Sequence, residues 1–257
     1  TVAVGEGVSM LIRDMSPEQL FTNYARHIGI GGIAMAGVIG IIRSSSIIKQ
    51  ALGLAVSELG GKKKGEGAVE RTQRDISMKF ILSGIISILI ATFVFFQFGV
   101  LGNLTHTIIA TLIVFVISFL FTTVAANAIA IVGSNPVSGM TLMTLILSSL
   151  VLVSAGLSGT SGMMAAMIIG GVVCTALSMA GGFITDLKIG YWLGTTPARQ
   201  EGWKFLGTAV SAATIAGVMM VLNQTYGFVG ENALVAPQAN AMAAVIKPLM
   251  EGGATPW

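Results

Sequence analysis

The sequence predicts an all-α integral membrane protein, a polytopic bundle of about six transmembrane helices with a broken helix near Asn135. Charged residues make up only 10% of the 257 residues, and the mean hydropathy is +0.86. Soluble domains carry about 25% charged residues. No Asp, Glu, Lys or Arg occurs from Phe80 to Thr185. Because a helix in water needs a polar face, this stretch excludes a soluble enzyme, a nucleic-acid-binding protein and a disordered chain.

Apolar runs long enough to cross a bilayer, which takes about 20 helical residues, recur along the whole chain. They are continuously apolar, unlike the alternating strands of a membrane barrel. Helices also satisfy every backbone polar group internally, as lipid requires. The first run could extend to residue 56 as a bent or tilted helix, and a short seventh element is left open at residues 239–250. The six predicted spans are residues 27–42, 76–99, 107–132, 136–155, 161–185 and 205–222.

The charged loops predict how this single transmembrane domain, residues 1–257, is oriented. Residues 57–75 and 186–204 carry basic side chains, and cytoplasmic loops are enriched in Lys and Arg. Both loops are therefore predicted to be cytoplasmic, whereas the uncharged segments 97–106 and 156–160 are predicted to lie outside. The mixed charges between Lys62 and Lys79 are typical of a solvated loop, so no nucleic-acid partner is expected.

Small residues recur every fourth position in two of the predicted helices. Such spacing places them along one helix face, and small faces let membrane helices pack closely. Tight packing is the favoured interpretation, with a sliding surface as the alternative. Cys174 is then a packing residue, no disulfide can form within the chain, and no metal site or cofactor is expected. The two ladders are Gly32, Ala36 and Gly40, and Ala166, Gly170, Cys174, Ser178 and Gly182.

The first candidate site is the segment from Asn127 to Thr141. A helix is predicted to end at Val132 and to restart after Pro136, because Asn-Pro initiates turns and proline disfavours helical geometry before it. The link is either a tight cytoplasmic turn or a break within the membrane. In the second case, freed backbone groups would line a substrate cavity, as in transporters with discontinuous helices. The candidate substrate-binding residues are Asn127, Ser134, Asn135, Ser138, Gly139 and Thr141.

The second candidate segment runs from Asp186 to Trp203. Tyr191 and Trp192 are typical of a membrane interface, and Thr195-Thr196-Pro197 predicts the start of the next helix. Asp186 lies at the end of the charge-free stretch and His106 lies inside it. Proton carriers need an ionisable group in the membrane, so these two residues are the candidate coupling groups.

Several of these segments resemble the oligopeptide transporter (OPT) family, which includes the yellow-stripe-like metal-chelate transporters. The resemblance rests on Ser134–Thr141 and, most specifically, on Asp186–Gln200, with further similarity at Arg26, Pro237 and Pro256–Trp257. It implies proton-coupled uptake of small peptides or metal chelates by a single polypeptide with more than six spans. The chain would then be a fragment, mostly from the second half of a full-length member. On family grounds the favoured site residues are Asn135, Pro136, Ser138, Gly139 and Thr141.

The predicted function is therefore secondary active transport of oligopeptides or of metal-chelate and siderophore complexes. The expected partners are the lipid bilayer, the substrate and protons, and the expected location is the bacterial inner (plasma) membrane. One alternative is a membrane subunit of a multi-component permease. An intramembrane enzyme is not expected, because the charge-free stretch offers no pair of ionisable groups.

Overall fold

The structure, a computed structural model, describes residues 15–25, 28–29, 31–32, 35, 39, 42, 46, 49–50, 53, 70–133, 135, 137–228 and 237–251. Every regular element in this part of the chain is helical, which confirms the predicted all-α class. The elements are α1 (Pro17–Leu20), η2 (Phe21–Ala25), η3 (Arg71–Gln73), α4 (Met78–Phe95), η4 (Phe96–Leu101), α5 (Leu104–Val132), α6 (Val137–Ser154), α7 (Gly159–Leu193), α8 (Pro197–Thr225) and α9 (Pro237–Glu251).

Five of the six predicted spans correspond to observed helices. By length and composition, four helical segments can cross a membrane: Arg71–Leu101, Leu104–Ile131, Gly159–Leu193 and Pro197–Thr225. The fifth, α6, is shorter but apolar over Gly139–Ser154. The short element left open at residues 239–250 is α9. The first predicted span and the loop at residues 57–75 lie largely outside the described residues, although residues 70–75 of that loop are described.

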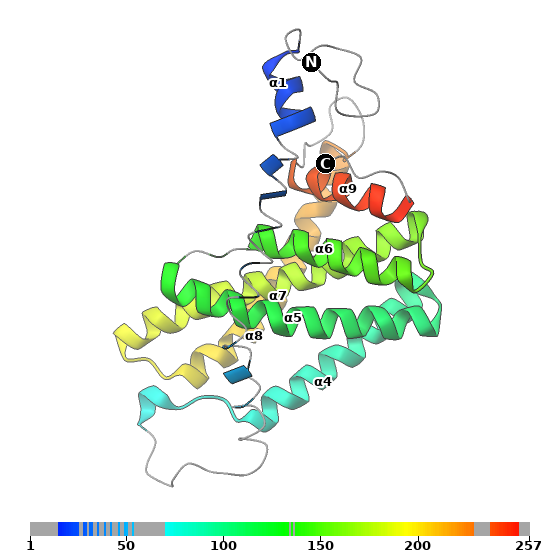
Figure 1. Ribbon diagram of the computed structural model, residues 1–257. Coiled ribbons are helices and arrows are strands. Elements are labelled where there is room, and N and C mark those ends of the chain that lie inside the picture. Colours follow the sequence, from blue (N-terminus) through cyan, green and yellow to red (C-terminus); the bar gives the residue numbers. More distant parts are fainter. Residues whose placement is uncertain are drawn as a thin grey trace.

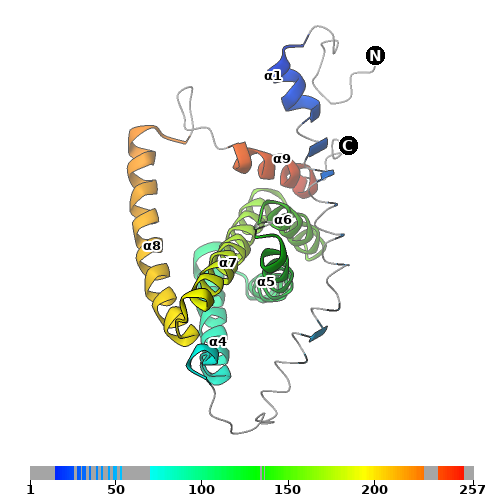
Figure 2. The ribbon, with the colours of Figure 1, turned by 90° about the vertical axis from the view of Figure 1, so that its left-hand side faces the viewer.

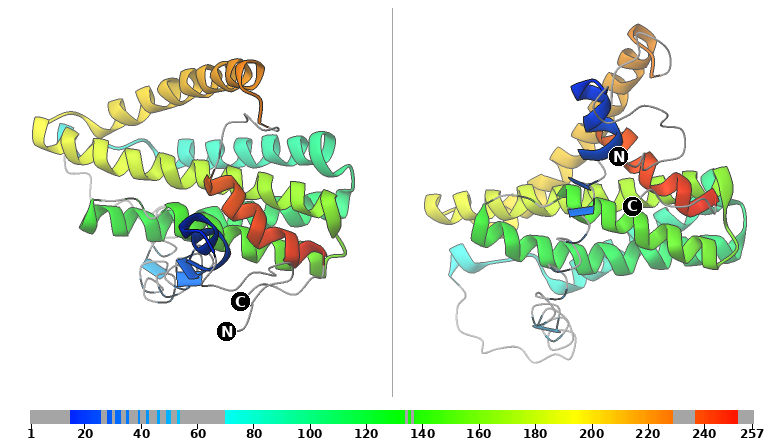
Figure 3. Two further views of the ribbon diagram at one scale, coloured as in Figure 1. Left: turned by 90° about the horizontal axis from the view of Figure 1, so that it is seen from above. Right: turned by 45° about the horizontal axis from the view of Figure 1, so that its top comes forward.

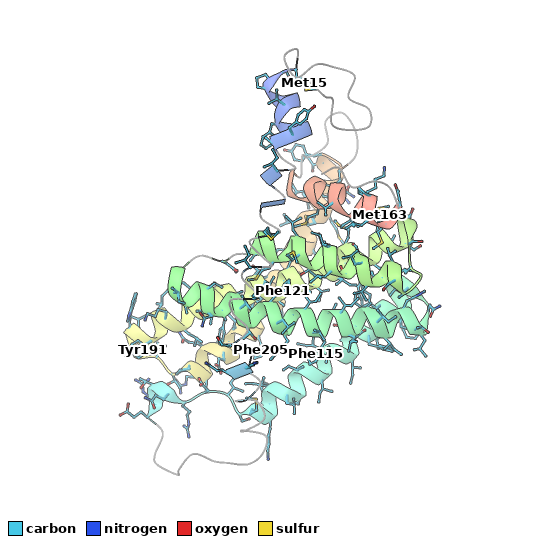
Figure 4. All side chains as sticks on the ribbon, in the orientation of Figure 1. Met15, Phe115, Phe121, Met163, Tyr191 and Phe205 are labelled. Atoms are coloured by element: carbon cyan, nitrogen blue, oxygen red, sulfur yellow. The ribbon has the colours of Figure 1, made fainter. Side chains whose placement is uncertain are left out.

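The centre of the molecule is an up-down-up bundle of α5, α6 and α7, with α9 lying across α6 and α7 (Figure 1). Phe121 of α5, Leu145 of α6 and Ile169 of α7 are fully buried in one core, and Ile246 of α9 joins it. Figure 4 shows Phe121 among these helices, whereas Phe115 lies on the outer side of α5 and is 43% exposed. Dispersion contacts in this core hold the helices together where lipid supplies no hydrophobic drive.

The small-residue ladder of α7 is only partly buried, which corrects the predicted packing face. Ala166 and Gly170 are buried and Cys174 is half-buried, but Ser178 and Gly182 are exposed. A strict four-residue step drifts around a helix of 3.6 residues per turn. The packed face instead takes a step of three from Gly170 to Val173, which brings it back towards the neighbouring helices. It therefore continues through Val173, Leu177 and Gly181.

Helices α4 and α8 stand at the periphery and bury little of themselves. The most apolar window of α8 contains no buried residue, and that of α4 is 6% buried. Figure 2 shows α8 splayed away from α5 and α6, although it starts beside the end of α7. Phe80 of α4 and Phe205 of α8 meet edge to face, with ring centroids 6.2 Å apart. Apolar helices this exposed need a nonaqueous environment, so the chain is an integral membrane protein.

The predicted loop at residues 186–204 is mostly helical, which is a second correction. Helix α7 continues to Leu193 and α8 begins at Pro197, so only three residues connect them. The predicted span ended early because Asp186 closes the apolar run, yet a charged residue stops a membrane span without stopping a helix. What ends α7 is Gly194, whose φ of 69° is left-handed and favours glycine.

Candidate functional site

The corner between α5 and α6 is built from Gly133 and Asn135. Gly133 ends α5 with a φ of 77°, and its N–H donates to the Ile129 carbonyl. Asn135 then reaches across to α7, where its Nδ2 donates to the Leu177 carbonyl oxygen over 3.1 Å. The same amide lies directly on Gly181, where an added Cβ would collide with it. The break predicted from Asn-Pro is therefore a helix corner fastened to the middle of α7.

The position of this corner favours the tight-turn alternative. Helix α5 has 29 residues, or about 43 Å at 1.5 Å per residue. Gly181 lies about 33 Å along α7 from Gly159 by the same rise, and a bilayer core is about 30 Å thick. If α7 enters the membrane near its start, Asn135 therefore lies near the opposite boundary of the bilayer and not at its midplane.

The remaining substrate-binding candidates surround this corner but are not all available for binding. Thr141 is 2% exposed, and its hydroxyl donates to the Val137 carbonyl in its own helix. Gly139 is half-buried in α6. Asn127 is half-buried in α5, and no hydrogen bond joins its side chain to the described residues. Ser134, Pro136 and the side chain of Ser138 lie outside what the structure describes.

A second polar site forms at the elbow between α7 and α8. The elbow is closed by backbone bonds from Thr195 N to Gly190 O (2.9 Å) and from Gly194 N to Tyr191 O (3.2 Å). Gly190 is buried because the Gln200 side chain lies on it, leaving no room for a Cβ. Gln200 Nε2 also donates to the Asp186 carbonyl over 3.3 Å. As predicted, Thr196 and Pro197 begin α8, although the Thr196 hydroxyl makes no capping bond.

The segment before α4 is fastened to this elbow by four hydrogen bonds. Arg71 Nη2 donates to the Gly194 carbonyl over 2.8 Å, and Arg71 Nη1 donates to the Thr196 hydroxyl over 3.4 Å. The backbone N–H of Ala198 donates to Arg74 O over 2.9 Å, and that of Ile76 donates to Glu201 Oε2 over 3.0 Å. These bonds hold the start of α4 beside the start of α8. Residues from both predicted cytoplasmic segments therefore lie at one end of the molecule.

The charged side chains of the elbow pair locally. Asp186 forms an ion pair with Lys204, and both side chains are partly exposed, at 50% and 31%. Lys188 Nζ lies 5.6 Å from the ring centre of Trp192 and 5.9 Å from that of Tyr191. Figure 4 places Tyr191 at the far end of α7. Aromatic rings beside a lysine at a helix end are typical of a membrane–water interface.

The two candidate coupling residues lie at opposite ends of the bundle. Asp186 belongs to the elbow, whereas His106 lies in the first turn of α5. His106 Nε2 is 3.2 Å from the Ala155 carbonyl, to which it donates when that nitrogen carries the proton. It thereby joins the start of α5 to the turn after α6. Among the described residues no group of three His, Cys, Asp or Glu side chains is placed to hold a metal ion.

The elbow contacts were missed by reasoning from the sequence alone. The segments 57–75 and 186–204 both carry charged residues and are both predicted to lie on the cytoplasmic side. That shared prediction is the signal that could have paired them. The residues that carry the contact are Arg71, Glu201 and Gln200, and nothing in their spacing indicates that the segments touch. Arg71 and Gly194 are 123 residues apart in the sequence.

Together, the apolar helices, the short helix corners and the charges gathered at one end define a polytopic α-helical membrane protein. A family model for the OPT oligopeptide transporter protein matches residues 9–257. The chain belongs to the OPT oligopeptide transporter family, as its two motifs had indicated.

One curated relative is longer than this chain. A protein of Haemophilus influenzae named "Putative oligopeptide transporter" is 25% identical over 257 aligned residues, which cover 86% of this chain. The chain spans only 39% of the length of that relative. No solved structure matches this chain.

Proposed function

We propose that this chain is part of a secondary active transporter that takes up oligopeptides, with protons as the coupling ion. The observation that carries the proposal is membership of the oligopeptide transporter family over residues 9–257. The four membrane-length helices support it. The bacterial relative favours a location in a bacterial inner membrane.

Within this proposal, Asn127 is the substrate-contacting residue to test first. Asn135 and Thr141 already use their side chains to hold the corner and a helix turn. Asn127 lies in the same part of the bundle with its amide unpaired among the described residues. An amide both donates and accepts hydrogen bonds, so it matches the peptide groups of a substrate.

The direct test is uptake by the full-length protein in proteoliposomes. Labelled peptides of different lengths and metal–siderophore complexes would be supplied with and without an inward proton gradient. We expect peptide uptake that depends on the gradient and stops when a protonophore is added. Uptake of chelates alone would favour the metal-chelate branch. No gradient-dependent uptake of any compound would contradict the proposal, and dependence on a co-purifying ATPase would favour a multi-component permease.

Variants connect that assay to the site. Asn127→Ala should lower peptide uptake by about tenfold, the effect of one lost hydrogen bond of about 1.4 kcal/mol. Asn223→Ala, at an exposed position near the end of α8, is the matched control and should leave uptake unchanged. His106→Gln and Asp186→Asn test the coupling candidates. Only the variant that removes the coupling group should abolish the response to the gradient.

A further inference from the structure

Basic side chains gather at the end of the molecule where α7 meets α8. Residues 70–79 and 186–204, which hydrogen bonds hold together at the elbow, carry six basic and four acidic side chains. The two turns at the opposite end, residues 97–106 and 156–160, carry no Asp, Glu, Lys or Arg. The two ends of the bundle formed by α5, α6 and α7 therefore differ in charge.

The acidic side chains of the elbow leave most of this positive charge uncompensated. Asp186 is paired with Lys204, and no other ion pair is formed within the described residues. The Glu201 carboxylate accepts a backbone N–H, and Arg71 donates to two neutral oxygens. The remaining positive charge is available to an anion from outside. The five exposed basic side chains, named here the basic elbow surface, are Arg71, Arg74, Lys79, Lys188 and Arg199.

Large apolar and aromatic side chains are exposed directly beside the basic elbow surface. Phe80 of α4 and Phe205 of α8 contact each other edge to face and are 56% and 61% exposed. At the end of α7, Tyr191 and Trp192 are 73% and 72% exposed. Lys188 Nζ lies 5.9 and 5.6 Å from their ring centres. An amphiphile with an anionic headgroup and apolar tails matches this juxtaposition of charged and apolar surfaces.

The length of α7 places this surface at the level of lipid headgroups. From Gly159 to Lys188 the helix rises about 43 Å at 1.5 Å per residue, and a bilayer with its headgroups is about 40–45 Å thick. If α7 enters the bilayer near its start, Lys188 therefore lies in the opposite headgroup layer. Both views of Figure 3 show the turn between α7 and α8 projecting beyond the corner between α5 and α6, so that corner does not cover it.

We propose that the basic elbow surface binds the headgroup of an anionic phospholipid, with Lys188 as a principal contact to the lipid phosphate. Lysine and arginine donate charge-assisted hydrogen bonds to phosphate oxygens, and basic clusters at the cytoplasmic end of membrane helices attract anionic lipids. A free phosphate ion shares this chemistry, but the apolar side chains beside the surface match only a lipid. The proposal depends on the elbow lying at the membrane surface and not on the transported substrate.

Fluorescence quenching by labelled lipids tests the headgroup preference at the elbow. Leu193→Cys, at a 74% exposed position of α7, would carry a fluorophore in the full-length protein with Cys174→Ala and no other cysteine. Phe98→Cys, 85% exposed at the uncharged end, is the matched control. Phosphatidylglycerol and phosphatidylcholine, each spin-labelled on an acyl chain, would serve as quenchers in mixed vesicles. Near Leu193 we expect an association constant at least about fivefold higher for phosphatidylglycerol, the effect of one lysine near an anionic surface. Near Phe98 we expect equal constants.

Variants identify the side chain that carries the preference. Lys188→Gln should lower the preference for phosphatidylglycerol near Leu193 by about fivefold, and Lys188→Arg should keep it. Lys247→Gln removes the same charge from α9, which contacts α7 at Gly162, near the other end of that helix. This control variant should leave the preference unchanged.

Three results would overturn the proposal. Equal association of both lipids near Leu193 would show that the elbow does not select a headgroup. Equal losses in Lys188→Gln and Lys247→Gln would assign the preference to the overall charge of the protein. Loss of the preference on addition of inorganic phosphate, at an ionic strength matched with sodium chloride, would show that the surface binds a free anion. None of these results bears on the proposed peptide uptake, which is measured separately in proteoliposomes.

Discussion

Two points along α7, its contact with the α5–α6 corner and its elbow with α8, are fastened in different ways. At the α5–α6 corner, one neutral amide lies on one glycine: Asn135 on Gly181, with a bond to Leu177. Further along α7 and at the elbow, the contacts are made by Arg71, Glu201, and the Asp186–Lys204 pair. One helix therefore passes from a neutral contact at Gly181 to a charged one at Asp186 within about 7.5 Å.

A helix that leaves the hydrocarbon of a bilayer is expected to change its contacts in this way. Unpaired charges are costly in hydrocarbon, so neutral groups and close packing hold helices there. Beyond the hydrocarbon, exposed charges pair at little cost and contribute little. The stability of the corner should accordingly depend on close packing, and the stability of the elbow on many weak polar contacts. Substitutions in the two regions should therefore differ in size and in salt dependence.

The largest effect is expected from filling the space over Gly181. Gly181→Val places side-chain atoms where the Asn135 amide lies. Overpacking a tight contact should lower the free energy of unfolding by about 1–3 kcal/mol, measured as a loss of thermal stability in detergent. Gly171→Val is the control, because nothing lies within 4 Å of a Cβ at Gly171. Equal destabilisation by both variants would show that the corner does not depend on close packing.

The next largest effect is expected from removing the amide itself. Asn135→Ala deletes the donor to the Leu177 carbonyl and should cost about 1 kcal/mol, the typical net value of one hydrogen bond. Asn127→Ala, whose amide is unpaired among the described residues, should leave stability within about 0.5 kcal/mol of wild type. The reverse order in a thermal unfolding comparison would exchange the structural and binding roles given to these two residues.

A smaller effect is expected at the elbow from Arg71. Arg71→Ala removes the 2.8 Å bond to the Gly194 carbonyl, and because the side chain is exposed we expect a loss of about 0.5–1 kcal/mol. Arg74 touches the elbow through its backbone carbonyl, so Arg74→Ala should be neutral in the same assay. If Arg74→Ala is as harmful as Arg71→Ala, general positive charge and not this bond matters.

The smallest effect is expected from the Asp186–Lys204 pair. Both side chains are partly exposed, so Asp186→Asn should cost less than about 0.5 kcal/mol and the cost should vanish at high salt. Thermal stability at low and high sodium chloride would measure it, with Asp75→Asn as an exposed control. A cost that persists at high salt would place this pair in a less solvated environment than the boundary described above.

The sequence predicted the helices well and their contacts less well, for physical reasons. The length of an apolar run predicts a membrane span, so α4 to α8 were predicted from the sequence. An apolar run ends at the first charged residue, however, even where the helix continues. For that reason α7 was predicted to stop near Thr185 when it continues to Leu193. Small-residue spacing indicated that α7 packs closely, yet which face packs depends on the crossing of α5 and α6. The break at Asn135 was expected from Asn-Pro, whereas its bond to Leu177 depends on a partner 42 residues away.

The most direct test of the boundary is the sidedness of three single cysteines in the full-length protein carrying Cys174→Ala. They are Asn135→Cys at the corner, Arg199→Cys at the elbow and Ser158→Cys in the turn between α6 and α7. With an impermeant thiol reagent in oriented vesicles, we expect the first two to react only from the cytoplasmic face and Ser158→Cys only from the opposite face. If Asn135→Cys reacts from the face opposite Arg199→Cys, or from neither, the corner does not lie at the cytoplasmic boundary of the membrane.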